Sequence, residues 1–158
     1  MPNIAIDKKV PAFNAPMTGG EEFSIAQHKG NYLVLYFYPK DSTPGCTKES
    51  QAFRDQYAKF KRLQTLVVGV SRDSLRSHEN FIAKQELPFP LISDQDEAVC
   101  SLFDVIKMKS LYGKQVRGIE RSTFLIDDQS VLRGEWRKVK VDGHVDEVLA
   151  ALKRLPKP

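Results

Sequence analysis

Two dense apolar runs are the feature that most constrains how this chain can fold. The first, "NYLVLYFYP", covers 31–39, and the second, "TLVVGVS", covers 65–71. Apolar residues fill both faces of each run, which is typical of strands buried on both sides in a sheet covered by helices. Between the runs, Phe53, Tyr57 and Phe60 recur at spacings of four and three residues and predict a helix. The sequence therefore predicts an α/β fold.

The middle of the chain continues this alternation of strands and helices. Residues 74–85 are predicted to form a helix with Ser74 as its N-cap, and 89–93 a short strand. A further helix is predicted over 96–106, because four apolar residues repeat at the i, i+3, i+4 and i+7 positions. These residues are Val99, Leu102, Phe103 and Ile106.

Hairpin signals lie toward the two ends of the chain. Residues 11–30 are rich in Pro, Gly and polar residues and predict a loop with a short hairpin, whereas 107–120 are predicted to be a loop. The runs 121–127 and 130–137 flank Asp-Gln and predict a second hairpin. An amphipathic helix over 144–155 closes the chain. This order predicts a central mixed sheet flanked by helices, with an antiparallel hairpin beside its parallel strands.

Length and composition indicate an ordinary globular protein. The 158 residues suit a single domain over 1–158, with 41% hydrophobic residues for a core and 28% charged residues for a solvated surface. The longest apolar run has the length of a strand and not of a membrane span. The N-terminal "MPNIAIDKKV" lacks the order of regions found in a signal peptide. We therefore expect a cytoplasmic protein that does not bind membranes.

The net charge of +4 does not by itself indicate a nucleic-acid ligand. Modest basic clusters occur at 59–62 and 137–140, but a nucleic-acid-binding protein needs a continuous patch or a recognisable module. Neither is visible, so we expect a solvated basic surface and no nucleic-acid partner. At most, this charge would help to attract a small anion or an acidic partner.

The two cysteines, Cys46 and Cys100, are predicted to be free thiols, because two cysteines without a secretion signal do not form a disulfide framework. His28, His78 and His144 are scattered in polar or helical contexts that resemble a surface. A structural zinc site needs about four closely spaced ligands, so we expect no metal.

Cys46 follows the signals of a helix start. Thr43 suits the N-cap and Pro44 the first helical position, which makes Cys46 the third helical residue. Ser42 or Asp41 are alternative caps. In each case the sulfur lies among unpaired backbone N–H groups at the positive end of the helix dipole, and these groups favour a thiolate over a thiol.

The position of Cys46 in the predicted sheet also suits a binding site. In open α/β sheets, ligands bind beyond the carboxyl ends of the strands. Pro39 ends the first buried strand, and Cys46 follows it after a short loop. Gly45 would let the backbone come close to whatever approaches the sulfur. The alternative is that Cys46 is a small buried residue packed at a helix start, since free cysteines are often plain hydrophobes.

The segment "PKDSTPGC", with its P-x-x-x-T-x-x-C spacing, resembles the active-site signature of the peroxiredoxins, and "PGCTKE" is similar to the Q, or bacterioferritin-comigratory-protein, type. The resemblance covers nearly the whole chain. It implies a thioredoxin-like fold with an N-terminal extension or hairpin. It also implies reduction of hydrogen peroxide and organic hydroperoxides without metal, heme or flavin. The further matching segments, in family order, are 10–13, 34–39, 67–74, 89–94 and 121–127.

Peroxide reduction requires more than an acidic thiol. A thiolate attacks one oxygen of the weak O–O bond while the other leaves as an anion, but an acidic thiol is a weaker nucleophile. Fixed donors aimed at the transition state supply what is missing, at about 3 kcal/mol or more per donor in other enzymes. The resemblance implies that these donors are the hydroxyl of Thr43, the N–H groups around Gly45 and Cys46, and the guanidinium of Arg121.

The resemblance also assigns supporting roles. It implies that Pro39 shields the sulfur from water and that Glu49 orients Arg121. Taken alone, Arg121 before a buried strand is typical of a solvated charge, and Glu49 is a favourable acid in a first helical turn. Thr43 cannot easily cap the helix and meet a peroxide at once, so the functional interpretation favours another cap, such as Ser42 or water.

Attack leaves Cys46 as a sulfenic acid that must be recycled. Many relatives carry a resolving cysteine where this chain has Gln51 or Ile82. The preferred interpretation is a one-cysteine mechanism with an external thiol, either glutathione with glutaredoxin or thioredoxin. The alternative is that Cys100, beside the apolar stripe of its helix and partly exposed, resolves Cys46, which requires Cα atoms within about 7 Å or local unfolding.

Three other functions could use a reactive cysteine. A cysteine hydrolase needs a histidine base with an orienting partner, and no hydrolase signature surrounds Cys46. A thioredoxin-type oxidoreductase needs C-x-x-C, but positions 43 and 49 hold Thr and Glu. A non-enzymatic redox sensor would have nearly the same sequence as a peroxidase and would differ in turnover. The resemblance further favours a monomer.

Overall fold

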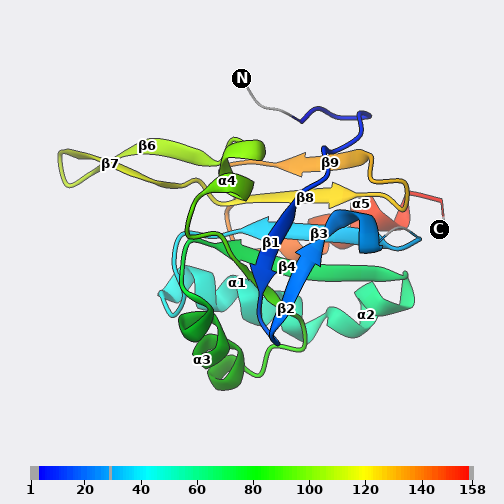
Figure 1. Ribbon diagram of the computed structural model, residues 1–158, viewed down its shortest axis with the longest axis horizontal. Helices are drawn as coiled ribbons and strands as arrows, with labels where there is room; N and C mark the ends of the chain where they lie inside the picture. Colours follow the sequence, from blue (N-terminus) through cyan, green and yellow to red (C-terminus); the bar gives the residue numbers. More distant parts are fainter. Residues whose placement is uncertain (1–3, 29, 157–158) are drawn as a thin grey trace.

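The computed structural model describes residues 4–28 and 30–156. A seven-stranded sheet, in the order β2-β1-β5-β4-β3-β8-β9, forms the centre of the molecule, and β6 and β7 form a separate two-stranded sheet (Figure 1). The strands are β1 (Asn14–Met17), β2 (Glu21–Ser24), β3 (Tyr32–Phe37), β4 (Thr65–Ser71), β5 (Leu91–Ser93), β6 (Ile106–Leu111), β7 (Lys114–Ile119), β8 (Ser122–Ile126) and β9 (Leu132–Trp136). The helices are η1 (Ile25–His28), α1 (Pro44–Asp55), α2 (Tyr57–Arg62), α3 (Leu75–Gln85), α4 (Ala98–Leu102) and α5 (His144–Lys153).

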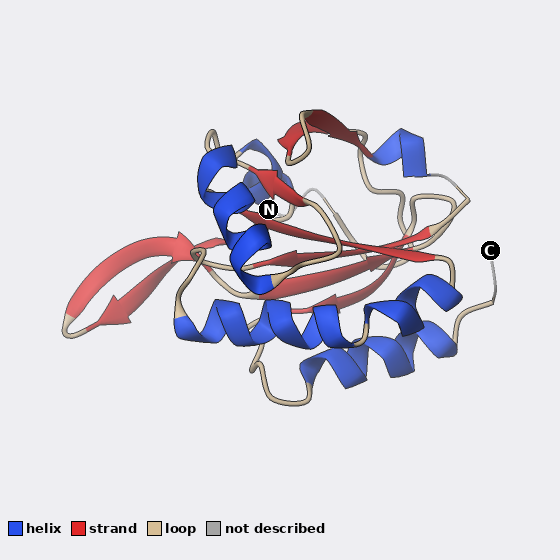
Figure 2. Ribbon diagram, turned by 90° about the horizontal axis from the view of Figure 1, so that it is seen from below, coloured by secondary structure: helices blue, strands red, loops and turns tan. Residues whose placement is uncertain are grey.

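The central strand β3 is buried at all six positions, as its apolar run predicts. Successive side chains of a strand point to opposite faces. Leu35 and Phe37 accordingly join a core cluster with α4 and the N-terminal hairpin, whereas Val34 and Tyr36 join a second cluster with the long helices. Figure 2 shows α1, α2 and α5 running along one face of the sheet. The predicted mixed sheet flanked by helices is confirmed.

Strand pairing brings the active-site segments to one edge of the sheet. β3, β4 and β5 are parallel neighbours, so their carboxyl ends lie at the same edge. β8 pairs antiparallel with β3, with Phe37 opposite Ser122. The chain therefore enters β8 at the edge where it leaves β3, which places Arg121 beside the loop that leads to α1.

The two predicted hairpins of the main sheet are present. β8 and β9 are antiparallel, and β1 and β2 form the N-terminal hairpin, which joins β5 through the pair Met17 and Ile92. The helix predicted after β3 is divided, because Gln56 leaves the helical conformation (φ −108°, ψ 7°) between α1 and α2. Among the described residues, no helix is long and apolar enough to cross a membrane.

Two sequence predictions in the second half of the chain are wrong. The helix predicted over 96–106 is only α4, because Asp104 adopts a left-handed conformation (φ 55°) and Ile106 already begins β6. The loop predicted over 107–120 is the β6–β7 hairpin, which extends away from the body of the molecule (Figures 1 and 2). Its turn residues Tyr112 and Gly113 both have positive φ, as the tight turns of two-residue hairpins require.

Candidate active site

The start of α1 has the backbone that the sequence predicts, but its cap differs. Thr43 occupies the N-cap in an extended conformation, and Pro44 is the first helical residue. The Thr43 side chain caps nothing, because its hydroxyl donates instead to the carbonyl of Lys40 (2.8 Å). The Thr43 oxygen therefore keeps its lone pairs, so it is placed to accept a hydrogen bond from a hydroxyl-bearing substrate.

Cys46 is the third residue of α1, and only 1% of it is exposed. The Thr47 N–H donates to the Thr43 carbonyl (2.8 Å), so the N–H groups of Gly45 and Cys46 stand ahead of the helical ladder, at the positive end of the dipole. The Arg121 Nη2 group donates to the sulfur across 3.4 Å. Cationic and dipolar groups thus surround a largely dry thiol.

Arg121 connects the thiol to a buried carboxylate. Its Nη1 group donates to Glu49 Oε1 (2.7 Å), and Glu49 is fully buried. Gly45 makes room for this arrangement, because a Cβ atom at that position would lie 3.2 Å from Arg121 Nη2. The guanidinium therefore lies in contact with the helix start, with one nitrogen on the sulfur and another on the carboxylate.

Glu49 keeps its proton more tightly than an ordinary glutamate. Burial raises the pKa of Glu49 to about 7, although the charge and hydrogen bond of Arg121 pull that pKa down. Its Oε2 atom has no hydrogen-bond partner in the part of the chain that the structure describes. The buried carboxylate loses its contacts with water and gains only Arg121 as a partner in return. This explains why the pKa of Glu49 is raised.

A second buried network holds the loop between β3 and α1. Asp41 Oδ1 accepts from the hydroxyl of Tyr38 (2.6 Å), and Asp41 Oδ2 accepts from Ser77 Oγ (2.8 Å) and His78 Nδ1 (2.7 Å). His78 Nε2 faces the carbonyl of Ile92 (2.9 Å). Both ring nitrogens of His78 therefore have hydrogen-bond partners, which hold the buried imidazole between Asp41 and the backbone of β5.

This network acts on a strained part of the backbone. Ser42, next to Asp41, has a φ of 64°, a conformation that costs free energy for residues other than glycine. The backbone N–H of Asp41 also donates to Asp73 Oδ2 (2.9 Å). The anchored Asp41 keeps the chain in the turn that delivers Thr43 and the helix start.

The expectation that the histidines lie on the surface is wrong for two of them. His78 is fully buried, and His144 is buried with its Nε2 atom 2.7 Å from the hydroxyl of Thr123. Burial and the nearby charge of Arg121 lower the pKa of His144 to about 4. Within residues 4–28 and 30–156, no histidine is hydrogen-bonded to Cys46, so a cysteine–histidine hydrolase pair is not assembled.

Cys100 lies on the other side of the sheet from Cys46. It belongs to the core cluster of α4, whereas Cys46 belongs to that of α1. The expected partial exposure is wrong, because Cys100 is fully buried. Burial, followed by the negative charge of Asp94, raises the pKa of the Cys100 thiol far above its ordinary value. Cys100 therefore packs in a different core cluster from Cys46, and its thiol is not readily ionised.

The remaining predicted site residues lie around the helix start. Pro39 is half-buried and directly follows the last buried residue of the β3 run, on the same loop as Thr43. Gln51 Nε2 donates to Gln85 Oε1 (2.8 Å) and ties α1 to α3. Sequence reasoning missed Asp41 and His78, although His78 lies three residues before Phe81 on the buried stripe of α3, which was the available signal.

Comparison with known proteins agrees with this geometry. The sequence profile of the AhpC/TSA family matches residues 6–134. Peroxiredoxin Bcp of Xanthomonas campestris is 52% identical over 155 residues, 97% of each chain. Peroxiredoxin Bcp of Bacillus subtilis is 48% identical over 150 residues, 95% of this chain and 96% of that protein.

Solved structures show the same fold. Peroxiredoxin Q of Xanthomonas campestris superposes with a TM-score of 0.86 at 54% identity, over 90% of both chains. A cysteine-to-serine mutant of Xylella fastidiosa PrxQ superposes with a TM-score of 0.90 at 42% identity, over 96% of both chains. With a fold and a sequence that agree over nearly the whole length, the chain belongs to the Q, or bacterioferritin-comigratory-protein, subfamily of the peroxiredoxins, which are thiol-dependent peroxidases with a thioredoxin-like fold.

Proposed function

We propose that this peroxiredoxin reduces hydrogen peroxide and organic hydroperoxides at Cys46, as a monomer, and that an external thiol then reduces the oxidised cysteine. The observation that carries the proposal is the 3.4 Å contact between Arg121 Nη2 and Cys46 Sγ at the start of α1. A guanidinium fixed in this place favours the thiolate before attack and remains beside the oxygen anion that forms afterwards.

The first step forms a sulfur–oxygen bond and breaks the O–O bond. The Cys46 thiolate attacks the terminal oxygen of ROOH, the electron pair of the O–O bond leaves on RO⁻, and RO⁻ takes a proton to become ROH. Cys46 is oxidised to a sulfenic acid. Negative charge moves from sulfur to the leaving oxygen, so donors that stay close to both lower the barrier. Arg121 and the N–H groups of Gly45 and Cys46 fill this role, and Thr43 accepts from the terminal O–H.

Organic hydroperoxides are included among the substrates on two grounds. A solved structure of the Xanthomonas campestris bacterioferritin comigratory protein is described in terms of alkyl peroxide reduction activity. In this chain, Cys46 packs within an apolar core cluster, and apolar surroundings suit an alkyl substituent as well as hydrogen peroxide.

The second step needs a thiol from outside the chain. Gln51 and Ile82 occupy the positions where many relatives keep a resolving cysteine, and Cys100 is buried across the sheet. We therefore assign a one-cysteine cycle with thioredoxin, or glutathione with glutaredoxin, as reductant. The cytoplasm, where these systems keep thiols reduced, is the compartment that suits the cycle.

Intact-mass analysis after one equivalent of hydrogen peroxide tests the one-cysteine cycle. Wild type and Cys100→Ser are expected to gain one oxygen or to over-oxidise, whereas Cys46→Ser stays unmodified. A loss of two hydrogens in wild type that neither mutant shows would establish a Cys46–Cys100 disulfide instead. Peroxide consumption by Cys46→Ser under turnover would refute the central role of Cys46.

The same proteins separate an enzyme from a sensor. A peroxidase consumes many equivalents of peroxide when dithiothreitol is supplied, whereas a sensor is oxidised once per regeneration and consumes little. We expect multiple turnovers for wild type and for Cys100→Ser.

A further inference from the structure

The β6–β7 hairpin carries apolar and basic side chains that the peroxidase chemistry does not use. We propose that it is the docking surface for the reductant, and that this reductant is a small protein dithiol with an acidic surface and an apolar rim around its thiols. The inference rests on the proposed one-cysteine cycle, because a chain that resolves its own sulfenic acid would need no such partner at this step.

The hairpin exposes an unusual share of large apolar side chains. Six such side chains are exposed in the described residues, and four of them lie on the hairpin. Tyr112 at its turn is 97% exposed and Met108 is 59% exposed. Leu111 and Val116 are exposed on the face opposite Met108. A two-stranded sheet is marginally stable in water on its own, and exposed apolar side chains that are concentrated on one element mark a candidate interaction site.

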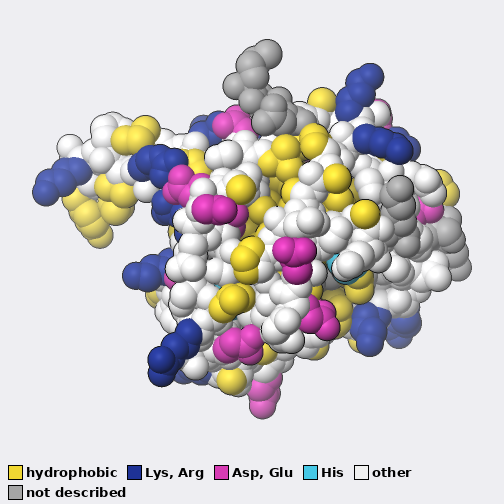
Figure 3. Space-filling view, in the orientation of Figure 1, with side chains coloured by type: hydrophobic (Ala, Val, Ile, Leu, Met, Phe, Trp, Pro, Cys, Tyr) yellow, Lys and Arg dark blue, Asp and Glu magenta, His cyan; other side chains and the backbone are white. Residues whose placement is uncertain are grey.

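The charge of the hairpin indicates what kind of protein would bind to it. Residues 106–119 contain three lysines and one arginine and no acidic residue. Lys107 pairs with Asp104, and Arg117 pairs with Glu97, but Lys109 and Lys114 have no acidic partner in the described part of the chain. Figure 3 shows dark blue and yellow side chains together along the hairpin. Such a surface is complementary to an acidic protein with exposed apolar groups.

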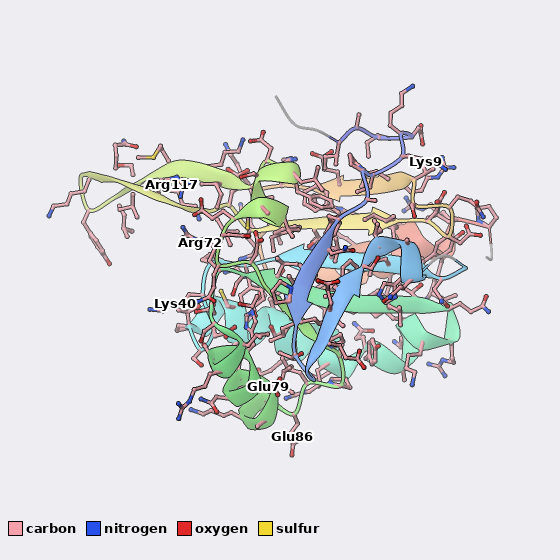
Figure 4. All side chains as sticks on the ribbon, viewed as in Figure 1. Lys9, Lys40, Arg72, Glu79, Glu86 and Arg117 are labelled. Carbon is pink, nitrogen blue, oxygen red and sulfur yellow. The ribbon has the colours of Figure 1, made fainter. Side chains whose placement is uncertain are left out.

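The hairpin extends past the edge where the Cys46 site lies. It projects from the edge at which β3 and β4 end (Figure 1), and in Figure 4 the labelled Lys40, Arg72 and Arg117 lie along this same edge. Near its root, Gly118 packs toward Arg72, with a Cβ position 3.8 Å from Arg72 Nη2. Glu97 fixes the root, because it accepts from both Arg72 (2.9 Å) and Arg117 (2.6 and 2.7 Å).

One face of the hairpin carries apolar and basic side chains together. Leu111 pairs with Lys114 and Lys109 pairs with Val116, and alternation along each strand puts these four side chains on one face. The Lys109 ammonium donates to the carbonyl of Ile119. Burial first, and then the charge of Arg121, lower the pKa of Lys109, while the charges of Glu120 and, less strongly, Cys46 oppose that shift. β7 ends at Ile119, two residues before Arg121, whose Nη2 group contacts Cys46 Sγ (3.4 Å). The root of the hairpin therefore lies next to the Cys46 site.

The chemistry explains why a docking surface is needed. The partner's first thiolate attacks Cys46 Sγ, an S–S bond forms, the S–O bond breaks, and hydroxide leaves and takes a proton as water. The partner's second thiolate then attacks its own sulfur in the mixed disulfide, which releases Cys46 as a thiolate and oxidises the partner to a disulfide. Cys46 is almost fully buried, so a protein thiol must be held in register at the mouth while both exchanges occur.

The test compares a protein dithiol with a small one. The probes are thioredoxin, kept reduced by thioredoxin reductase and NADPH, and dithiothreitol. The variant is Tyr112→Ser with Lys114→Glu, at the exposed tip and away from the reacting atoms. We expect kcat/KM for thioredoxin to fall about tenfold or more, equivalent to about 1.4 kcal/mol. Turnover with dithiothreitol and the stopped-flow rate of sulfenic acid formation should stay unchanged.

Matched controls separate docking from general charge effects. Lys61→Glu makes the same charge change on the exposed surface of α2 and should leave kcat/KM for thioredoxin as in wild type. An unchanged kcat/KM for thioredoxin in the hairpin variant would overturn the proposal. So would an equal loss with dithiothreitol, or a wild type that dithiothreitol recycles but thioredoxin does not.

Two further outcomes have separate meanings. A wild type that is dimeric by light scattering, and monomeric when the hairpin is changed, would assign the hairpin to self-association and overturn docking of the reductant. Failure of wild type to form a sulfenic acid with peroxide would refute the proposed function itself, because that step is measured without any reductant.

Discussion

Glu49→Gln isolates the energetic consequence of burying an acid beside Arg121. The pKa of Glu49 in the folded chain is about 7, above its ordinary value of 4.5. A group with a raised folded pKa contributes stability below its unfolded pKa and loses it as the pH rises through the folded pKa. The wild type should therefore lose stability between pH 4.5 and about 7, and Gln, which stays neutral, removes this slope.

The size of the effect follows from the same two values. The gap between 4.5 and about 7 corresponds to about 3 kcal/mol, at about 1.4 kcal/mol per pH unit. The side chain is fully buried, so solvent does little to screen this penalty. Gln keeps an acceptor oxygen for Arg121 and nearly the same volume, which limits the other consequences of the substitution.

Urea denaturation of both proteins measures the difference in the free energy of unfolding across this pH range. Other titrating groups, including His144, cancel in the difference because both proteins contain them. We expect Glu49→Gln to become more stable relative to wild type as the pH rises, by about 3 kcal/mol in total. A difference that stays constant with pH would show that Glu49 titrates at its ordinary pKa and that burial is not what sets its protonation.

Three further substitutions test other parts of the structure. Gly45→Ala places a Cβ atom 3.2 Å from Arg121 Nη2. Because this partly displaces one donor worth about 3 kcal/mol, sulfenic acid formation should slow about tenfold. A stopped-flow rate equal to that of wild type would contradict this. Cys100→Ser should leave peroxide turnover with dithiothreitol intact and lower the free energy of unfolding by about 1–3 kcal/mol, because it buries a hydroxyl; loss of turnover would instead make Cys100 part of the cycle. His78→Phe should lower the free energy of unfolding by about 1–3 kcal/mol, because it removes one of the hydrogen-bond partners of the buried Asp41 side chain. A double-mutant cycle with Asp41→Asn should show coupling between the two residues, and additive losses would contradict this.

Local patterns predicted the parts of this fold that depend on neighbouring residues in the chain. The β3 and β4 runs are apolar on both faces, so they could only be central strands, and Pro44 after Thr43 identified the start of α1. Ser74 was correctly predicted as the cap of α3, because its side chain accepts from the Ser77 N–H (3.1 Å). Signals of this kind need no knowledge of distant contacts.

The wrong secondary-structure predictions fall where a local sequence pattern is compatible with two different structures. The stripe that ends at Ile106 fits a helix, but the left-handed Asp104 ends the helical conformation and sends the chain into β6. The β6–β7 turn is Tyr112-Gly113 and not the Asn-Gly that marks most tight hairpins. Strand residues with Lys at alternate positions also hide the apolar pattern on which strand prediction depends.

Site residues that act through tertiary contacts were the hardest to predict. His78 is 37 positions from Asp41 in the sequence, and their 2.7 Å contact arises only when α3 packs beside the loop after β3. Arg121 reaches Cys46 because β8 is antiparallel to β3. The resemblance to the peroxiredoxins predicted that Arg121 belongs to the site, whereas no sequence motif predicted the role of His78.

The geometry also explains why the acid beside Arg121 is buried without a second partner. Arg121 contacts Glu49 Oε1 through Nη1 (2.7 Å) and Cys46 Sγ through Nη2 (3.4 Å), so one positive charge serves two groups that can each become anions. A carboxylate with its ordinary acidity would already neutralise the guanidinium. Because burial raises the pKa of Glu49 to about 7, a proton on Glu49 leaves the charge of Arg121 available to the Cys46 thiolate. The Oε2 atom has no hydrogen-bond partner among the described residues, whereas Oε1 accepts from Arg121, so Oε2 is the oxygen of Glu49 on which this proton fits.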